Sequence, residues 1–245
     1  MLNPNVIKLR GTIFLPKTIG YSSANELKYR GLLPNSVAAS ITPPTIQISP
    51  AGLQVIQDSK LEEGGSWQLL AGDTHVVFSQ VKVDIIRDVV APLNSVEIDF
   101  CAFCSRLFRI ILKEEGLQAN RLAFAPLYAK DRDDNFQSKL LWHDQLSHST
   151  YENVDIEEVS LTYNYRVEKK IIGQKRTINF KTIISDAQKQ LPSGVIIQGC
   201  VTISLDINTA VDQNQLVVFT EAEVEEFFNK VPSWNLDFIR NNIDA

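Results

Sequence analysis

Two cysteines, Cys101 and Cys104, form the most recognisable chemical motif in the chain, a C-x-x-C pair. Such a pair does redox chemistry when an exposed thiolate lies at the N-terminus of a helix, and it binds zinc when two further ligands complete the site. The surrounding pattern instead predicts that both cysteines lie about two turns inside a helix, on its apolar side. A free cysteine packs there as a small hydrophobic residue, so the sequence favours core packing.

Two histidines, His143 and His148, and the neighbouring Asp144 are the next candidates, either for acid–base chemistry or as zinc ligands. No serine or cysteine has a recognisable nucleophile setting, and the sequence has no G-x-S-x-G, H-E-x-x-H, P-loop or G-x-G-x-x-G motif. We therefore predict no catalytic residues, no cofactor and no metal, and we interpret the histidines as surface groups.

An acidic cluster at Asp131, Asp133 and Asp134 has side chains that suit a divalent cation. Basic residues interleave with these acids, and the calcium-loop pattern is incomplete, which argues against a calcium site. An enzyme that uses carboxylates such as Asp131, Asp133 or Asp206 remains the alternative hypothesis: a hydrolase or nuclease dependent on metal.

The densest group of basic residues flanks a predicted hairpin turn at Gly173-Gln174. Phosphate contact is one interpretation, and it makes nucleic acid a partner to consider, although a less favoured one. Lysines at the end of a hairpin also prevent edge-to-edge aggregation of sheets, and we favour that explanation. The residues concerned are Lys169, Lys170, Lys175 and Arg176.

Composition limits the classes to which the protein can belong. The 245 residues include 24 basic and 29 acidic side chains, a net charge of -5, which argues against a dedicated binder of duplex DNA. No apolar run approaches the roughly 20 residues of a membrane helix, and the first residues lack the pattern of a signal peptide. Three cysteines are too few for a disulfide framework, so we expect a cytoplasmic protein without membrane contact.

The periodicity predicts an α+β fold, with mainly antiparallel sheet, one long central helix and a C-terminal helical segment. Asn94 and Glu97 have capping-box spacing at the start of a helix that Gly116 ends. Thr220 to Glu223 form a second capping box, which opens a C-terminal helix that Pro232 interrupts near Lys230 and that resumes over 233–241. We expect two α+β halves, 1–116 and 117–245, either as side-by-side units or as one continuous sheet. Predicted strands cover 6–15, 45–49, 53–56, 67–70, 75–86, 120–130, 159–172, 175–185 and 195–208, and a short helix covers 23–29.

The predicted helix 94–115 is apolar over more than half of its circumference. A helix on one sheet needs an apolar stripe only a little over 100° wide, so this helix must contact a second apolar layer. That layer is either another part of the same chain or a second subunit. The candidate interface residues on this helix are Phe103, Leu107, Phe108 and Ile111.

Two C-terminal strands alternate regularly between apolar and polar residues. Such strands usually have one face on the core and one in water. If these strands are neighbours, their polar sides form an open platform, which is either solvated sheet or a shallow recognition surface. The polar sides are Thr162, Asn164, Arg166 and Glu168 in one strand, and Thr202, Ser204, Asp206 and Asn208 in the other.

A resemblance to a protein family rests on five segments of the chain. They are the run 65–78, the helix 95–115, and the segments Asn120 to Pro126, Thr162 to Arg166 and Asp206 to Thr209. Together they resemble a sporadically distributed family of bacterial α+β proteins of unknown function. The resemblance implies a sheet, a long helix and a strand with an arginine near its start, here Arg121. Because such families accompany mobile or defence-related loci, it implies a partner protein more than a substrate.

These observations lead to one hypothesis about function. We expect a non-catalytic cytoplasmic protein that binds a partner protein or a second copy of itself.

Overall fold

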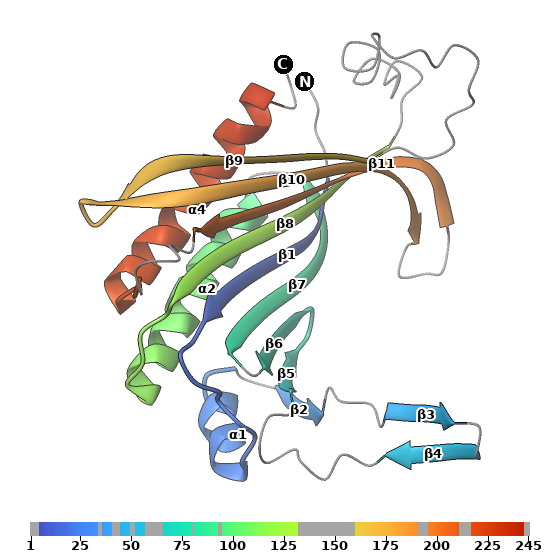
Figure 1. Cartoon of the computed structure of the whole chain (residues 1–245), viewed down its shortest axis with the longest axis vertical. Coiled ribbons are helices and arrows are strands. Elements are labelled where there is room, and N and C mark those ends of the chain that lie inside the picture. Colours follow the sequence, from blue (N-terminus) through green and yellow to red (C-terminus); the bar gives the residue numbers. More distant parts are fainter. Residues whose placement is uncertain are drawn as a thin grey trace.

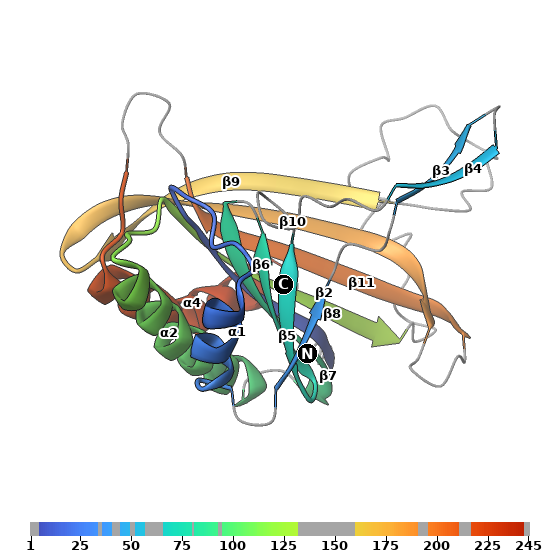
Figure 2. The same cartoon turned by 90° about the horizontal axis from the view of Figure 1, so that it is seen from below.

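The computed structural model of the protein describes residues 5–33, 36–40, 45–49, 52–56, 66–79, 81–92, 95–131, 160–190, 196–210 and 217–242. Within these ranges the fold is α+β, and its main element is a nine-stranded antiparallel sheet with the strand order β2-β5-β6-β7-β1-β8-β11-β10-β9. The helices gather on one side of this sheet (Figures 1 and 2). A separate two-stranded sheet pairs β3 with β4.

The strands largely follow the alternation of the sequence. One predicted strand, 75–86, is in fact two strands, β6 and β7, because the chain turns between Ser79 and Lys82. The strands are β1 (Asn5–Phe14), β2 (Val37–Ser40), β3 (Thr45–Ser49), β4 (Gly52–Ile56), β5 (Trp67–Ala71), β6 (Thr74–Ser79), β7 (Lys82–Pro92), β8 (Arg121–Asp131), β9 (Ser160–Ile171), β10 (Gln174–Gln190) and β11 (Ile196–Thr209).

The helices begin and end where the capping signals place them. Helix α1 (Ser23–Arg30) starts after Ser22, whose hydroxyl accepts from the Asn25 backbone N–H at 3.0 Å. Helix α2 (Ser95–Glu115) ends before Gly116, which has a φ of 61°. Asn94 lies outside the described residues, so its capping role stays a prediction.

Helix α4 (Glu221–Asn242) opens with the predicted capping box: the Glu223 N–H donates to the Thr220 hydroxyl at 3.3 Å, and the Thr220 N–H donates to the Glu223 carboxylate at 3.0 Å. The predicted interruption at Pro232 is wrong, because α4 continues through this residue. Two helices of similar length, α2 and α4, therefore take the place of one long central helix and a shorter C-terminal segment.

The two halves of the chain repeat one order of elements. The first half runs from β1 through the meander β5-β6-β7 to α2, and the second runs from β8 through the meander β9-β10-β11 to α4. In each half the first strand pairs with the last strand of the meander. Strands β1 and β8 then pair with each other, so one sheet continues from the first half into the second.

Helices α2 and α4 pack against each other and against the centre of this sheet (Figure 1). Gly11 of β1 lies beneath both helices, and a Cβ atom at this position would stand 2.7 Å from the Cys104 sulfur and 3.3 Å from the Phe228 ring. The absence of a side chain thus lets the helices approach the sheet closely.

Helix α4 is the second apolar layer that the wide apolar face of α2 requires. Leu107, Phe108 and Ile111 are between 0 and 4 % exposed, and Phe108 packs on Phe228 of α4 with ring centroids 5.2 Å apart. These buried residues offer no surface to a second subunit, which corrects the interface predicted for them. Phe103 is partly buried beside the same core, and the guanidinium groups of Arg87 and Arg106 lie 5.5 and 5.7 Å from the centroid of its ring.

Candidate functional site

Strand β9 is the last strand of the sheet, and no described strand pairs with its outer edge. Five consecutive residues of this strand are exposed: Thr162, Tyr163, Asn164, Tyr165 and Arg166. We call them the β9 edge surface. A strand with one face on a core normally alternates between buried and exposed residues, so five exposed residues in a row show that both faces of β9 are open here.

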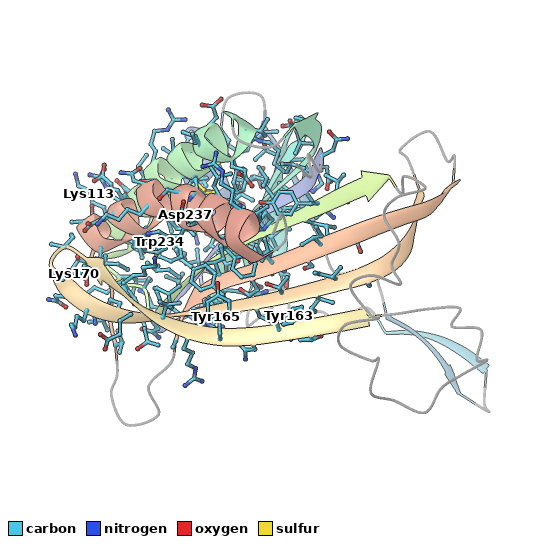
Figure 3. All side chains as sticks on the ribbon, turned by 90° about the horizontal axis from the view of Figure 1, so that it is seen from above. Lys113, Tyr163, Tyr165, Lys170, Trp234 and Asp237 are labelled. Atoms are coloured by element: carbon cyan, nitrogen blue, oxygen red, sulfur yellow. The ribbon has the colours of Figure 1, made fainter. Side chains whose placement is uncertain are left out.

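Two tyrosines of this surface lie on the side of the sheet that carries the helices. Tyr165 stacks on Phe180 of β10 and on Phe238 of α4, with centroid distances of 5.1 and 5.5 Å, yet it is 37 % exposed. Tyr163 precedes Tyr165 in β9, farther from the hairpin turn, and is 39 % exposed (Figure 3). Partial burial raises the pKa of Tyr165 to about 12, so its hydroxyl stays protonated at neutral pH. The result is an exposed aromatic surface on an edge strand.

Alternate residues of β9 direct their backbone hydrogen-bonding groups to its outer edge, with which no described strand pairs. Ile172 and Gly173, with φ angles of 46° and 73°, form the two-residue turn that joins β9 to β10, and Ile171 pairs with Gln174. In such a hairpin the closing pair is hydrogen bonded and the pairs then alternate, so even-numbered residues of β9 direct their N–H and C=O groups outward. The Lys170 carbonyl follows this alternation: it points away from β10 and accepts a hydrogen bond from the Lys230 ammonium of α4 at 3.2 Å.

The tip of this hairpin is attached to α4. The Ile172 backbone N–H donates to the Glu226 carboxylate, and Lys230 forms an ion pair with the same glutamate. The predicted turn at Gly173-Gln174 is therefore displaced by one residue, because Ile172 takes the left-handed conformation that precedes Gly173. These contacts fix β9 relative to α4 and make the edge a defined surface.

The four basic residues of the predicted phosphate patch do not form one patch. Lys169 lies over the Trp234 ring at 5.8 Å, and Arg176 pairs with Glu223 at 2.5 Å, so these two face α4. Lys175 pairs with Glu168 at 2.9 Å and lies opposite Lys170 in the register. The hairpin thus divides the cations between its two faces, and salt bridges engage two of them.

The polar sides of β9 and β11 do lie on one face of the sheet, as their alternation predicts. They are not direct neighbours, however, because β10 lies between them, and Arg166 is aligned with Asn179 and then Asn208. The side-chain Oδ1 of Asn179 and Nδ2 of Asn208 are buried and have no hydrogen-bond partner among the described residues. This face is the one that the described helices leave open.

A charged cluster occupies the same face near the centre of the sheet. Asp84 accepts two hydrogen bonds from Arg10, at 2.9 and 2.7 Å, and one from Thr12 at 2.6 Å, and Lys82 lies 3.0 Å away. Burial opposes ionisation of Asp84, but the hydrogen bonds from Arg10 and Thr12 prevail and lower its pKa. A carboxylate so fully paired has no free lone pair with which to activate a substrate.

A second buried cluster joins the two helices to β8. Glu97 of α2, 1 % exposed, accepts from the Tyr128 hydroxyl and, at 3.0 Å, from the Asn235 amide of α4. Burial raises the pKa of Glu97 to about 7, although both hydrogen bonds act in the opposite direction. Because the three side chains are enclosed by the core, we interpret the cluster as a structural link between the halves.

Two acidic residues of the enzyme hypothesis, Asp131 and Asp206, lie far apart on the sheet. Asp131 is aligned with Cys200 at one end of β11, whereas Asp206 is aligned with Lys181. Six residues of β11 separate these positions, about 20 Å at roughly 3.3 Å per residue. Asp133, Asp134, His143, Asp144 and His148 lie outside the described residues.

The cysteine pair packs in the core, as predicted. Cys101 and Cys104 are free and at most 1 % exposed, and burial raises the pKa of both thiols. Within the described ranges, no three histidine, cysteine or acidic side chains gather in a way that could hold a metal ion.

Sequence reasoning missed two features of these sites. Alternation assigned Tyr163 and Tyr165 to the apolar face of their strand, and only the position of α4 leaves them exposed. The sequence predicted Glu97 as the glutamate of a capping box, whereas the structure shows it in contact with Tyr128 and Asn235. The signal that could have indicated this cluster was a polar Asn235 among the apolar positions of its helix.

No protein-family model matches the chain, and no curated protein matches it. None of the helices in the described ranges is long and apolar enough to cross a membrane. The functional proposal therefore rests on the geometry of the site.

Proposed function

We propose that this chain is a non-catalytic binding protein and that the β9 edge surface is where it binds another polypeptide. The observation that supports this proposal is the run of exposed residues 162–166 on an edge strand. An edge strand offers backbone N–H and C=O groups to an added strand, and aromatic side chains beside it add contact area. Tyr163 and Tyr165 occupy that position.

The first half of the chain supports this interpretation by analogy. Strand β5 is the outermost strand of its meander, as β9 is of the second, and its edge is paired with β2. The equivalent edge of β9 therefore belongs to a fold that accepts an additional antiparallel strand at this place.

The described acidic residues favour binding over catalysis. Asp84 is held by three neighbouring side chains, Glu97 lies in the core, and Asp206 stands apart from Asp131. Free Cys101 and Cys104 suit a reducing compartment, so we place the protein in the cytoplasm. The resemblance described above adds a bacterial origin and a mobile or defence-related locus to the proposal.

A photocrosslinking residue at position 163 tests the proposed site in cells. Replacing Tyr163 by p-benzoylphenylalanine keeps an aromatic ring on the surface, and we expect irradiation to attach a polypeptide there, identified by mass spectrometry. Leu27 of α1, which is 76 % exposed, provides the matched control position for the same photocrosslinker. Absence of an adduct at position 163, or equal labelling at both positions, would contradict the proposal.

A further inference from the structure

We infer that the polypeptide bound by the β9 edge surface is β9 of a second copy of this chain, in an antiparallel pair centred on Asn164. This inference rests on the proposed function and names its partner. Two copies related by a twofold axis would join their sheets edge to edge, as many symmetric dimers do.

The backbone of β9 limits the possible registers. Only even-numbered residues have outward N–H and C=O groups, so an even-numbered residue must face an even-numbered residue in each hydrogen-bonded pair. Centring on Asn164 pairs Asn164 with its own copy and Thr162 with Arg166, and both pairs satisfy this condition. The register also leaves the Lys170 carbonyl free to keep its bond with Lys230.

The side chains of the same residues complement each other in this register. On the side that carries the helices, Tyr163 of each copy lies opposite Tyr165 of the other, in pairs without backbone hydrogen bonds, where side chains approach most closely. On the opposite side, Thr162 lies across from Arg166, and asparagine from asparagine. The two tyrosine pairs would cover the aromatic surface that each chain leaves exposed.

Neighbouring registers fit less well. Centring on Arg166 places two arginines directly opposite each other, which is destabilising. Centring on Val167 would pair Arg166 with Glu168, but it also draws Lys170 into the ladder opposite Asn164, where Lys230 already occupies its carbonyl. Centring on Tyr163 also brings no like charges together, but it leaves one tyrosine pair and places Tyr165 opposite Leu161. The register on Asn164 brings no like charges together, loses no existing contact and places both tyrosines of each copy opposite tyrosines.

The chain already contains a junction of the same kind. Strands β1 and β8, the first strands of the two halves, pair antiparallel and join two equivalent units into one sheet. A β9–β9 pair would repeat that junction at the other edge of the second half. This precedent favours a second copy over an unrelated protein.

A charge-swap experiment on the purified full-length protein tests the inference. In this register position 164 faces itself, so Asn164→Lys and Asn164→Asp each place like charges together and should raise the Kd for self-association at least about tenfold. Mixing the two variants places lysine opposite aspartate and should restore the dimer. Sedimentation velocity measures all three samples, and neutral Asn164→Thr, expected to remain dimeric, is the matched control.

A cysteine at the same position tests the register. The Cα atoms of a hydrogen-bonded antiparallel pair lie about 5.5 Å apart, within the range that a disulfide spans. Asn164→Cys in a Cys200→Ser background should therefore form a disulfide dimer on mild oxidation. Thr162→Cys should not, because its copy lies four residues away along the strand, roughly 13 Å.

Several outcomes would overturn the inference. They are a wild-type monomer at every concentration, charge variants that stay dimeric, or a lysine–aspartate mixture that stays monomeric. Thermal melting verifies that each variant folds. If photocrosslinking at position 163 captures only a different protein, the proposed function holds and the second copy is wrong; if it captures nothing, both fail.

Discussion

The two halves of the molecule carry equivalent aromatic clusters, and other elements cover one of them more completely than the other. In the first half Trp67 of β5 stacks on Phe78 of β6 at 4.1 Å, with the rings 7° from parallel, and Tyr29 of α1 lies against both. Trp67 also donates from Nε1 to the Ile19 carbonyl at 3.0 Å. All three rings are 1 % exposed, so this cluster is closed.

In the second half Tyr165 of β9 stacks on Phe180 of β10 with the rings 4° from parallel, and Phe238 of α4 covers one side. Tyr165 remains 37 % exposed, although Phe180 is 2 % exposed. The first cluster has α1 and β2 beside it, and both come from the segment between β1 and β5. The same unit is therefore closed in the first half, where inserted elements lie beside it, and keeps an open edge strand in the second half.

The largest expected loss of stability comes from a substitution in the closed cluster of the first half. Trp67→Ala removes a fully buried stacked ring and should lower the free energy of unfolding by about 3–5 kcal/mol. Tyr165→Ala removes a half-exposed ring and should cost about 1.5 kcal/mol, the upper end for an aromatic pair. Urea unfolding followed by circular dichroism measures both values. Equal losses would contradict the difference in cover between the two halves.

The next prediction concerns how stability depends on pH through two glutamates, Glu97 and Glu223. They occupy the third position of α2 and of α4. The folded state raises the pKa of Glu97 from 4.5 to about 7, so protonation favours folding. The free energy of unfolding should therefore fall as pH rises from about 4.5 to about 7, by at most about 3 kcal/mol. Glu97→Gln should remove this slope and stabilise the protein at pH 8. If Glu97→Gln keeps the same slope, another titrating group causes the pH dependence of the free energy of unfolding.

Glu223 provides the opposite case within the same prediction. Burial opposes ionisation, but hydrogen bonds from Arg176 and Thr220 prevail and lower its pKa. The ionised carboxylate thus stabilises the folded state above the ordinary pKa of glutamate, and this contribution is lost as pH falls through the lowered value. Glu223→Gln should lower stability at pH 7 and flatten the acid side of the curve of unfolding free energy against pH.

The smallest effect probes the junction between the halves. Gly11→Ala places a Cβ atom 2.7 Å from the Cys104 sulfur and should cost about 2 kcal/mol through overpacking. Cys104→Ala removes the sulfur, so Gly11→Ala should cost less stability in the Cys104→Ala background than in the wild-type protein. Thermal unfolding of the four proteins gives the coupling energy. Additive effects would show that Gly11 and Cys104 do not share this contact.

Local signals predicted much of the fold. Alternation located most strands because one face of each packs on the core, and the Thr220–Glu223 capping box located the start of α4. The same signals failed at Pro232, where a local rule predicted a break that the helix does not show. The width of the apolar face of α2 predicted a second layer, but the identity of that layer depends on where the chain returns.

The candidate site was less predictable, because it depends on what covers each strand. The alternation of Tyr163 and Tyr165 is that of a core strand, and their exposure follows from the position of α4 and from the place of β9 at the end of the sheet. The basic residues adjoin one turn in sequence, but alternation across the hairpin sends Lys169 and Arg176 to one face and Lys170 and Lys175 to the other.

Local sequence patterns were enough to specify the individual elements, because periodicity sets which residues face a core, and capping residues and glycines set where helices end. These patterns also indicated that Cys101 and Cys104 are packing residues, since both lie on the apolar side of a helix. Three features depend on long-range packing: the two halves share one sheet, α4 covers α2, and no described strand covers the edge of β9. These features depend on contacts between residues far apart in the chain, and local sequence patterns do not predict the energies of such contacts.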